Sequence, residues 1–90
     1  MQKYIHVYVY GIVQGVGYRY FAYKWAKRLG INGKVKNLPD GRVEVEGEGE
    51  EENLKLFLDK LSEGPFGAVV EKIDVQWKDY QGLFEDFYIF

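Results

Sequence analysis

GIVQGVGYRY, residues 11–20, joins a run of alternating apolar residues to a run with helical spacing. It places Gly11, Gly15, Gly17 and Arg19 within nine positions. A turn between a strand and a helix uses glycine where the main chain takes a positive φ. The stretch therefore has two interpretations: a plain turn, or a loop that also holds a ligand.

The residues on either side of this loop predict a strand and a helix. Residues 3–13 alternate with a period of two, and their inward positions are Ile5, Val7 and Val9. Residues 19–29 have the spacing of an amphipathic helix, and Gly30 follows at the position of a C-cap. The loop therefore lies where a strand ends and a helix begins.

The remainder of the chain predicts a hairpin, a second helix and two more strands. NGKVKNLPDGRVEVEG, residues 32–47, is typical of a hairpin, with lysines on one strand opposite glutamates on the other. A helix is expected over 50–63, a strand over about 70–78 and a short strand in 84–90. This order is the ferredoxin-like split βαβ pattern. We expect one α+β domain, residues 1–90, with an antiparallel sheet, two helices on one face and an extra C-terminal strand.

The second face of the expected sheet is uncovered and carries aromatic side chains: Tyr4, His6, Tyr8 and Tyr10. Such a row could stack on RNA bases. The neighbouring strand, however, places acidic residues on the same face: Glu44, Glu46 and Glu48. Because these carboxylates would repel phosphates, we favour a weak homodimer through this face over RNA.

Composition excludes several other classes of function. The 90 residues contain no cysteine and one histidine, so a disulfide framework, a thiolate nucleophile and a cysteine or histidine zinc cluster are excluded. Neither a signal peptide nor a membrane span is predicted, and the expected location is the cytoplasm. The net charge of −2 argues against a general nucleic-acid binder.

The loop itself has the features of an anion site. Gly15 and Gly17 allow successive N–H groups to face one point, and the following helix adds its positive N-terminal end. Arg19 can form a bidentate pair with a phosphate or a carboxylate. The loop has neither the Walker A nor the Rossmann signature, so we expect it to hold a small terminal phosphate.

Asn37 is expected beside this loop. The first two strands of a split βαβ unit run parallel, so their C-terminal ends share one edge of the sheet. Asn37 has the same parity as the inward Val35 yet is polar. It either starts the turn at residues 39–41 or holds a water next to the anion.

GIVQGVGYR, residues 11–19, together with GINGKVKNLPDGRVEV, residues 30–45, resembles the acylphosphatase family, and the resemblance covers essentially the whole chain. It implies an enzyme that hydrolyses the carboxyl–phosphate anhydride of acyl phosphates. The lack of cysteine, of a metal cluster and of a Ser-His-Asp set predicts that the reaction needs no metal or cofactor. Because the loop and Arg19 would also hold inorganic phosphate, this product is expected to inhibit the enzyme. The resemblance also implies that Arg19 binds the phosphate and Asn37 orients the attacking water. The implied phosphate-binding residues are Gln14, Gly15, Val16, Gly17, Tyr18 and Arg19.

Two positions depart from the family pattern. Ile12 stands where many members have a basic residue, and Tyr18 stands where phenylalanine is common. Ile12 is expected to weaken long-range attraction for the substrate dianion. Two alternatives to an enzyme stay open from the sequence: a non-catalytic anion-binding module and a sheet-surface RNA binder.

Overall fold

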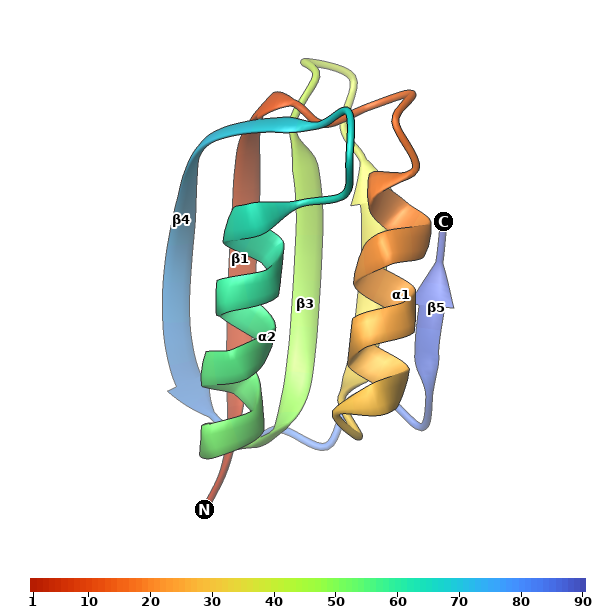
Figure 1. The fold of residues 1–90 in the computed structure, drawn as a ribbon. Helices are drawn as coiled ribbons and strands as arrows, with labels where there is room; N and C mark the ends of the chain where they lie inside the picture. Colours follow the sequence, from red (N-terminus) through yellow and green to blue (C-terminus); the bar gives the residue numbers. More distant parts are fainter.

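A computed structural model describes residues 1–90 as a five-stranded sheet with both helices on one face (Figure 1). This arrangement confirms the predicted α+β ferredoxin-like fold. The elements in chain order are β1 (Gln2–Ile12), α1 (Tyr18–Arg28), β2 (Asn32–Asn37), β3 (Val43–Glu50), α2 (Glu51–Glu63), β4 (Val69–Asp79) and β5 (Phe87–Ile89).

The sheet has the strand order β4-β1-β3-β2-β5. Strands β1 to β4 pair antiparallel, whereas β5 pairs parallel to β2. The four strands of the split βαβ unit are antiparallel as predicted, and the extra C-terminal strand, whose direction the sequence left open, makes the sheet mixed. After β4 the chain passes from one edge of the sheet to the other, so β5 meets β2 running in the same direction (Figure 1). Strands β1 and β2 run parallel with β3 between them. Their C-terminal ends therefore lie at the same end of the sheet, next to the β1–α1 loop.

Apolar rows under the helices form the core. One row crosses the sheet in register through Val75, Val7, Val45, Val35 and Ile89. The three central valines of this row are fully buried beneath α1 and α2. The helices contribute buried side chains at helical spacing: Ala22, Ala26, Leu54, Phe57 and Leu61. Removing this apolar surface from water is the main stabilisation of the fold.

The second face of the sheet is partly covered. Tyr4 and Glu48 are 4% and 3% exposed. The oxygens of Glu48 accept four consecutive main-chain N–H groups, those of residues 81–84 in the β4–β5 connection. The expectation that Tyr4 and Glu48 lie on an uncovered face was wrong, because this connection crosses over them on its way to β5.

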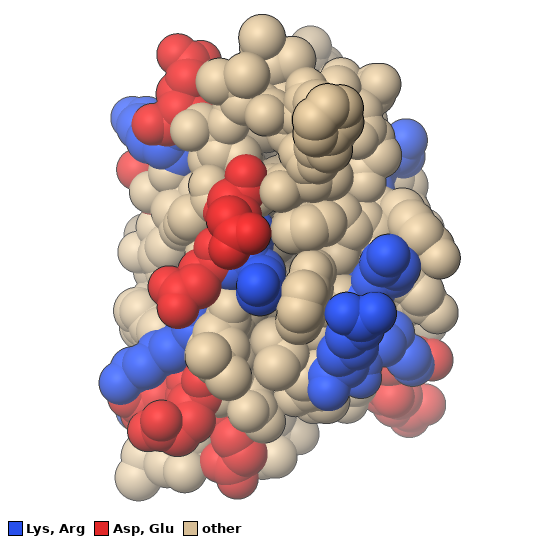
Figure 2. Space-filling model, viewed as in Figure 1, with Lys and Arg blue, Asp and Glu red and all other residues tan.

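Charge is divided between the elements of the surface. The predicted lysine–glutamate pairing across the hairpin is present between Lys34 and Glu46, at 3.3 Å. On the helix face, α1 carries basic side chains and no acidic ones, whereas α2 carries acidic side chains together with Lys55 and Lys60 (Figure 2). Neither helix has the length and apolar character needed to cross a bilayer.

Candidate active site

The β1–α1 loop owes its shape to glycine. Gly15 and Gly17 have φ values of 73° and 77°, which L side chains rarely adopt. A Cβ at either position would meet nothing within 4 Å, so the requirement is conformational. At Gly11 the requirement is space, because a Cβ there would lie 2.0 Å from the main-chain oxygen of Val69.

The main-chain donors of this loop are unused by the protein. Gly17 is the N-cap of α1 and supplies no side-chain cap. None of the N–H groups of residues 15–19 has a hydrogen-bond acceptor within the protein. Because unpaired donors and the helix dipole both favour negative charge at this end of α1, the loop is suited to bind an anion.

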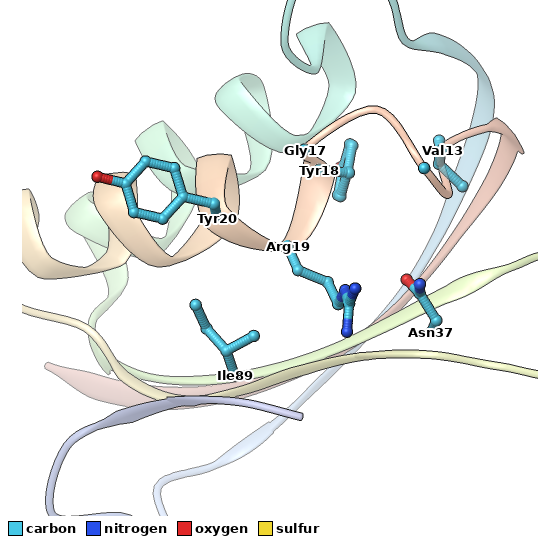
Figure 3. A pocket seen from close by; sticks show the side chains of 8 residues that line it. Val13, Gly17, Tyr18, Arg19, Tyr20, Asn37 and Ile89 are labelled. Carbon is cyan, nitrogen blue, oxygen red and sulfur yellow. The ribbon is translucent and has the colours of Figure 1, made fainter.

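Arg19 and Asn37 meet at a pocket beside the loop. The pocket has a volume of about 250 Å³ and is lined by Val13, Gly15, Gly17, Tyr18, Arg19, Tyr20, Asn37 and Ile89. The Arg19 side chain extends from the first turn of α1 toward Asn37 at the end of β2 (Figure 3). Its Nη1 donates a 2.7 Å hydrogen bond to the main-chain oxygen of Phe90. The sequence prediction that these two residues lie together is confirmed.

Asn37 has an unusual environment. Its Oδ1 is buried and has no hydrogen-bond partner. The turn that follows β2 is stabilised instead by Asp40, whose oxygens accept hydrogen bonds from the main chain and side chain of Arg42. Buried polar atoms nearly always have a partner. An unpaired amide oxygen at the pocket therefore indicates that a bound molecule supplies the hydrogen bond.

The comparisons with known proteins agree with this geometry. Residues 5–89 match the acylphosphatase family model. The chain belongs to the acylphosphatase family. An acylphosphatase of Thermus thermophilus is 57% identical over 75 residues, which cover 83% of this chain and 85% of that protein. One from Caldanaerobacter subterraneus is 42% identical over the whole length of both chains. The crystal structure of acylphosphatase from Bacillus subtilis superimposes with a TM-score of 0.94 at 37% identity, covering 100% and 99% of the chains.

Two of the residues expected to bind phosphate have other roles in this acylphosphatase fold. The side-chain amide of Gln14 donates to the main-chain oxygens of Leu38 and Arg42, at 2.8 and 2.9 Å. It therefore joins the glycine loop to the β2–β3 turn and sets the loop against Asn37. Val16 packs against the hydrophobic core. Neither side chain lines the pocket, so any contact with phosphate is left to their N–H groups.

Tyr18 shows what the departure from phenylalanine does. Its ring is 1% exposed, and its hydroxyl donates a 2.6 Å hydrogen bond to the main-chain oxygen of Leu61 near the end of α2. Burial raises the pKa of Tyr18, so the hydroxyl stays protonated. The residue thus anchors the start of α1 to α2.

Three pocket features were not predicted from the sequence: Tyr20, Ile89 and the bond from Arg19 to Phe90. Tyr20 follows Arg19 directly, and its position in the first helical turn could have suggested it. The other two depend on β5 lying beside β2, which no local pattern reveals.

A group with metal-ligand atoms lies on the opposite face of the sheet. One atom each of His6, Glu44 and Glu46 fall within 4.8 Å of one another. His6 Nε2 is already 2.7 Å from Glu44 Oε2, and Glu46 binds Lys34 and the hydroxyl of Tyr4. His6 and Glu44 pair with each other, Glu46 pairs with other side chains, and none of the three lines the pocket.

Proposed function

We propose that this acylphosphatase hydrolyses acyl phosphates by in-line attack of a water held by Asn37 on a phosphate bound by Arg19 and the N–H groups of residues 15–19. The observation that carries the proposal is the pocket in which unpaired loop donors, an arginine and an unpartnered amide oxygen converge. Family membership supplies the coarser statement, hydrolysis of acyl phosphates.

Binding of the phosphate follows from the donors that surround the pocket. The loop N–H groups have no acceptor within the protein, and Arg19 adds a planar fork that matches two phosphate oxygens. The transition state of phosphoryl transfer is loose, with its charge on the three equatorial oxygens. Donors fixed before the reaction stabilise that charge without reorganisation.

Asn37 is suited to position the nucleophile. Its Oδ1 accepts a hydrogen bond from water, which leaves a lone pair of the water oxygen free for attack on phosphorus. The amide sits at the end of β2, fixed in a ladder with β3, so the water is held in a defined direction.

The remaining steps need no side-chain acid or base. The water oxygen forms a bond to phosphorus while the bond between phosphorus and the acyl oxygen breaks, and the carboxylate leaves with the electron pair. A carboxylate is a good leaving group and needs no general acid. The pocket lining holds no carboxylate or imidazole, so the proton of the water passes to a phosphate oxygen.

The first test is release of inorganic phosphate from acetyl phosphate. We expect turnover by the wild-type chain and competitive inhibition by inorganic phosphate, which would bind the same donors. A folded protein that binds phosphate without turnover would support the anion-binding module instead. The predicted homodimer through the second sheet face is a separate matter, and sedimentation would measure it.

Replacement of Asn37 by alanine tests the role of the water. We expect Asn37→Ala to lower kcat by roughly 10²-fold or more, the scale of losing one preorganised hydrogen bond. The affinity for inorganic phosphate should barely change, because bound phosphate does not need the water. Asn53→Ala, on α2 away from the pocket, is the matched control. A folded Asn37→Ala protein with near-normal turnover would refute the assignment.

A further inference from the structure

The pocket has a second end that the phosphate does not use. Tyr20 of α1 and Ile89 of β5 line it. In Figure 3 they lie on the side of Arg19 opposite Asn37, with Ile89 beneath the first turns of α1. The cavity is thus polar at the glycine loop and apolar between α1 and β5.

Ile89 lies at this end of the pocket because it is the last member of the apolar row that crosses the sheet. It pairs with Val35 and so has the inward parity of the core. It nevertheless remains 44% exposed, because β5 is the edge strand and α1 only partly covers it. An apolar side chain on the core face of a sheet, left accessible beside a charged site, offers surface for a ligand to cover.

Tyr20 borders the same end of the pocket, and its ring extends along α1 away from Arg19 (Figure 3). Its ring stacks with Tyr23 at a centroid distance of 6.2 Å, and Lys24 Nζ lies 5.4 Å from its centre. The side chain is 59% exposed, and these two contacts restrict its ring. A ligand that packs against it therefore does not have to order it first, which lowers the entropic cost of binding.

We propose that Tyr20 and Ile89 form the subsite for the acyl group, and that this subsite favours an aromatic or branched aliphatic acyl group over acetyl. The inference rests on the proposed function, because it places the phosphate at the loop. The pocket volume of about 250 Å³ is below the roughly 300–1,000 Å³ of pockets for drug-sized ligands. The substrate is accordingly a small acyl phosphate.

This subsite contributes to substrate binding and not to the chemical step. The acyl group touches Tyr20 and Ile89 before and during transfer, since only the phosphoryl group moves. Contacts that are equal in the ground state and the transition state lower KM and leave kcat unchanged. This separates the subsite from Arg19 and Asn37, whose loss lowers kcat.

The experiment compares benzoyl phosphate with acetyl phosphate in the variants Tyr20→Ala and Ile89→Thr. Ile89→Thr keeps β-branching, and alanine suits a helix. For benzoyl phosphate we expect each variant to lower kcat/KM by roughly tenfold through KM, the lower end for loss of an apolar pocket contact. For acetyl phosphate the loss in kcat/KM should be clearly smaller, because a methyl group covers less of the two side chains than a phenyl ring does. Tyr88→Thr is the control, since it removes a 43% exposed side chain from the opposite face of β5.

A binding measurement separates this inference from the proposed function. Phenylphosphonate and methylphosphonate carry the same anion with and without a ring, and neither is hydrolysed. We expect calorimetry to show tighter binding of phenylphosphonate by the wild type and loss of that preference in both variants. Absence of turnover with a clear phenyl preference would refute the hydrolase and leave the subsite. Equal affinities, or equal losses on both acyl phosphates, would overturn the subsite.

Discussion

Two stretches of main chain in this molecule have consecutive N–H groups that helices and strands leave unpaired, at opposite ends of the sheet. Residues 81–84 donate to Glu48, which is 3% exposed and belongs to β3. Residues 15–19 have no acceptor within the protein. In Figure 1 the first stretch lies at the lower end of the sheet and the second at the upper end.

The difference shows how one kind of main-chain geometry serves two purposes. Where the chain provides its own carboxylate, the donors become a structural clamp that holds the β4–β5 connection and delivers β5 to β2. Where the chain provides no carboxylate, the same kind of donors stay unpaired, and we propose that they bind the phosphate. Arg19 and Asn37 accompany only the second stretch. Changes that remove an anion or a donor should therefore affect stability at one end and ligand binding at the other.

The largest effect is expected on catalysis, from Arg19→Lys in the loop of residues 15–19. One ammonium group cannot replace a planar fork, so we expect KM to rise and kcat to fall together, with kcat/KM reduced by about 10³-fold. The melting temperature should barely change. Steady-state kinetics with acetyl phosphate measures the effect, and Arg28→Lys at the far end of α1 is the control. Rescue by lysine would mean that Arg19 acts only as a point charge.

Glu48→Gln, at the stretch of residues 81–84, should lower stability and leave phosphate binding largely unchanged. Its amide group would face main-chain donors in place of a carboxylate oxygen, so we expect a loss of unfolding free energy on the order of 3 kcal/mol. Urea unfolding measures this loss. Phosphate affinity at low temperature should change far less than stability. A variant with unchanged stability and weakened phosphate binding would contradict the division between the two stretches.

Gly17→Ala tests whether phosphate binding depends on the direction in which the loop N–H groups point. At a φ of 77° alanine should cost about 1 kcal/mol of stability. Phosphate affinity should fall by roughly tenfold, the loss of about one charge-assisted hydrogen bond. The stabilisation of the fold by added phosphate should shrink accordingly. Gly67→Ala is a matched control, because Gly67 has a φ of 94° and equally open surroundings. Equal phosphate affinities in the two variants would reduce the loop to a turn.

The smallest effect is expected from Tyr18→Phe, which separates anchoring of the loop from binding by it. Removing the hydroxyl leaves the main-chain oxygen of Leu61 unpaired and should cost about 1 kcal/mol of stability. Turnover should be retained, because the hydroxyl is bonded to α2 and the proposed phosphate contact of Tyr18 is its main-chain N–H group. Thermal unfolding measures the first effect and the acetyl phosphate assay the second. Tyr23→Phe, whose hydroxyl has no partner, should change neither; a loss of turnover in Tyr18→Phe alone would place its hydroxyl in catalysis.

The sequence by itself determined the element order and predicted that Arg19 and Asn37 lie at one place in the fold. Periods of two and 3.6 are local, so the strands and helices could be placed within a few residues of their bounds. The glycine loop and Arg19 are contiguous, and parallel strands end at one edge, which was enough to bring Asn37 to the loop. The motif resemblance supplied the activity, which the family match then confirmed.

Only the tertiary structure showed the features of the fold and the pocket that depend on the path of the β4–β5 connection. The direction of β5, the burial of Tyr4 and Glu48, and the position of Ile89 beside Tyr20 follow from where that connection crosses the sheet. These contacts join residues more than 30 positions apart, such as Glu48 to Gln81 and Arg19 to Phe90. No periodicity in the chain encodes such pairings, because they arise only when the packed layers bring the segments together.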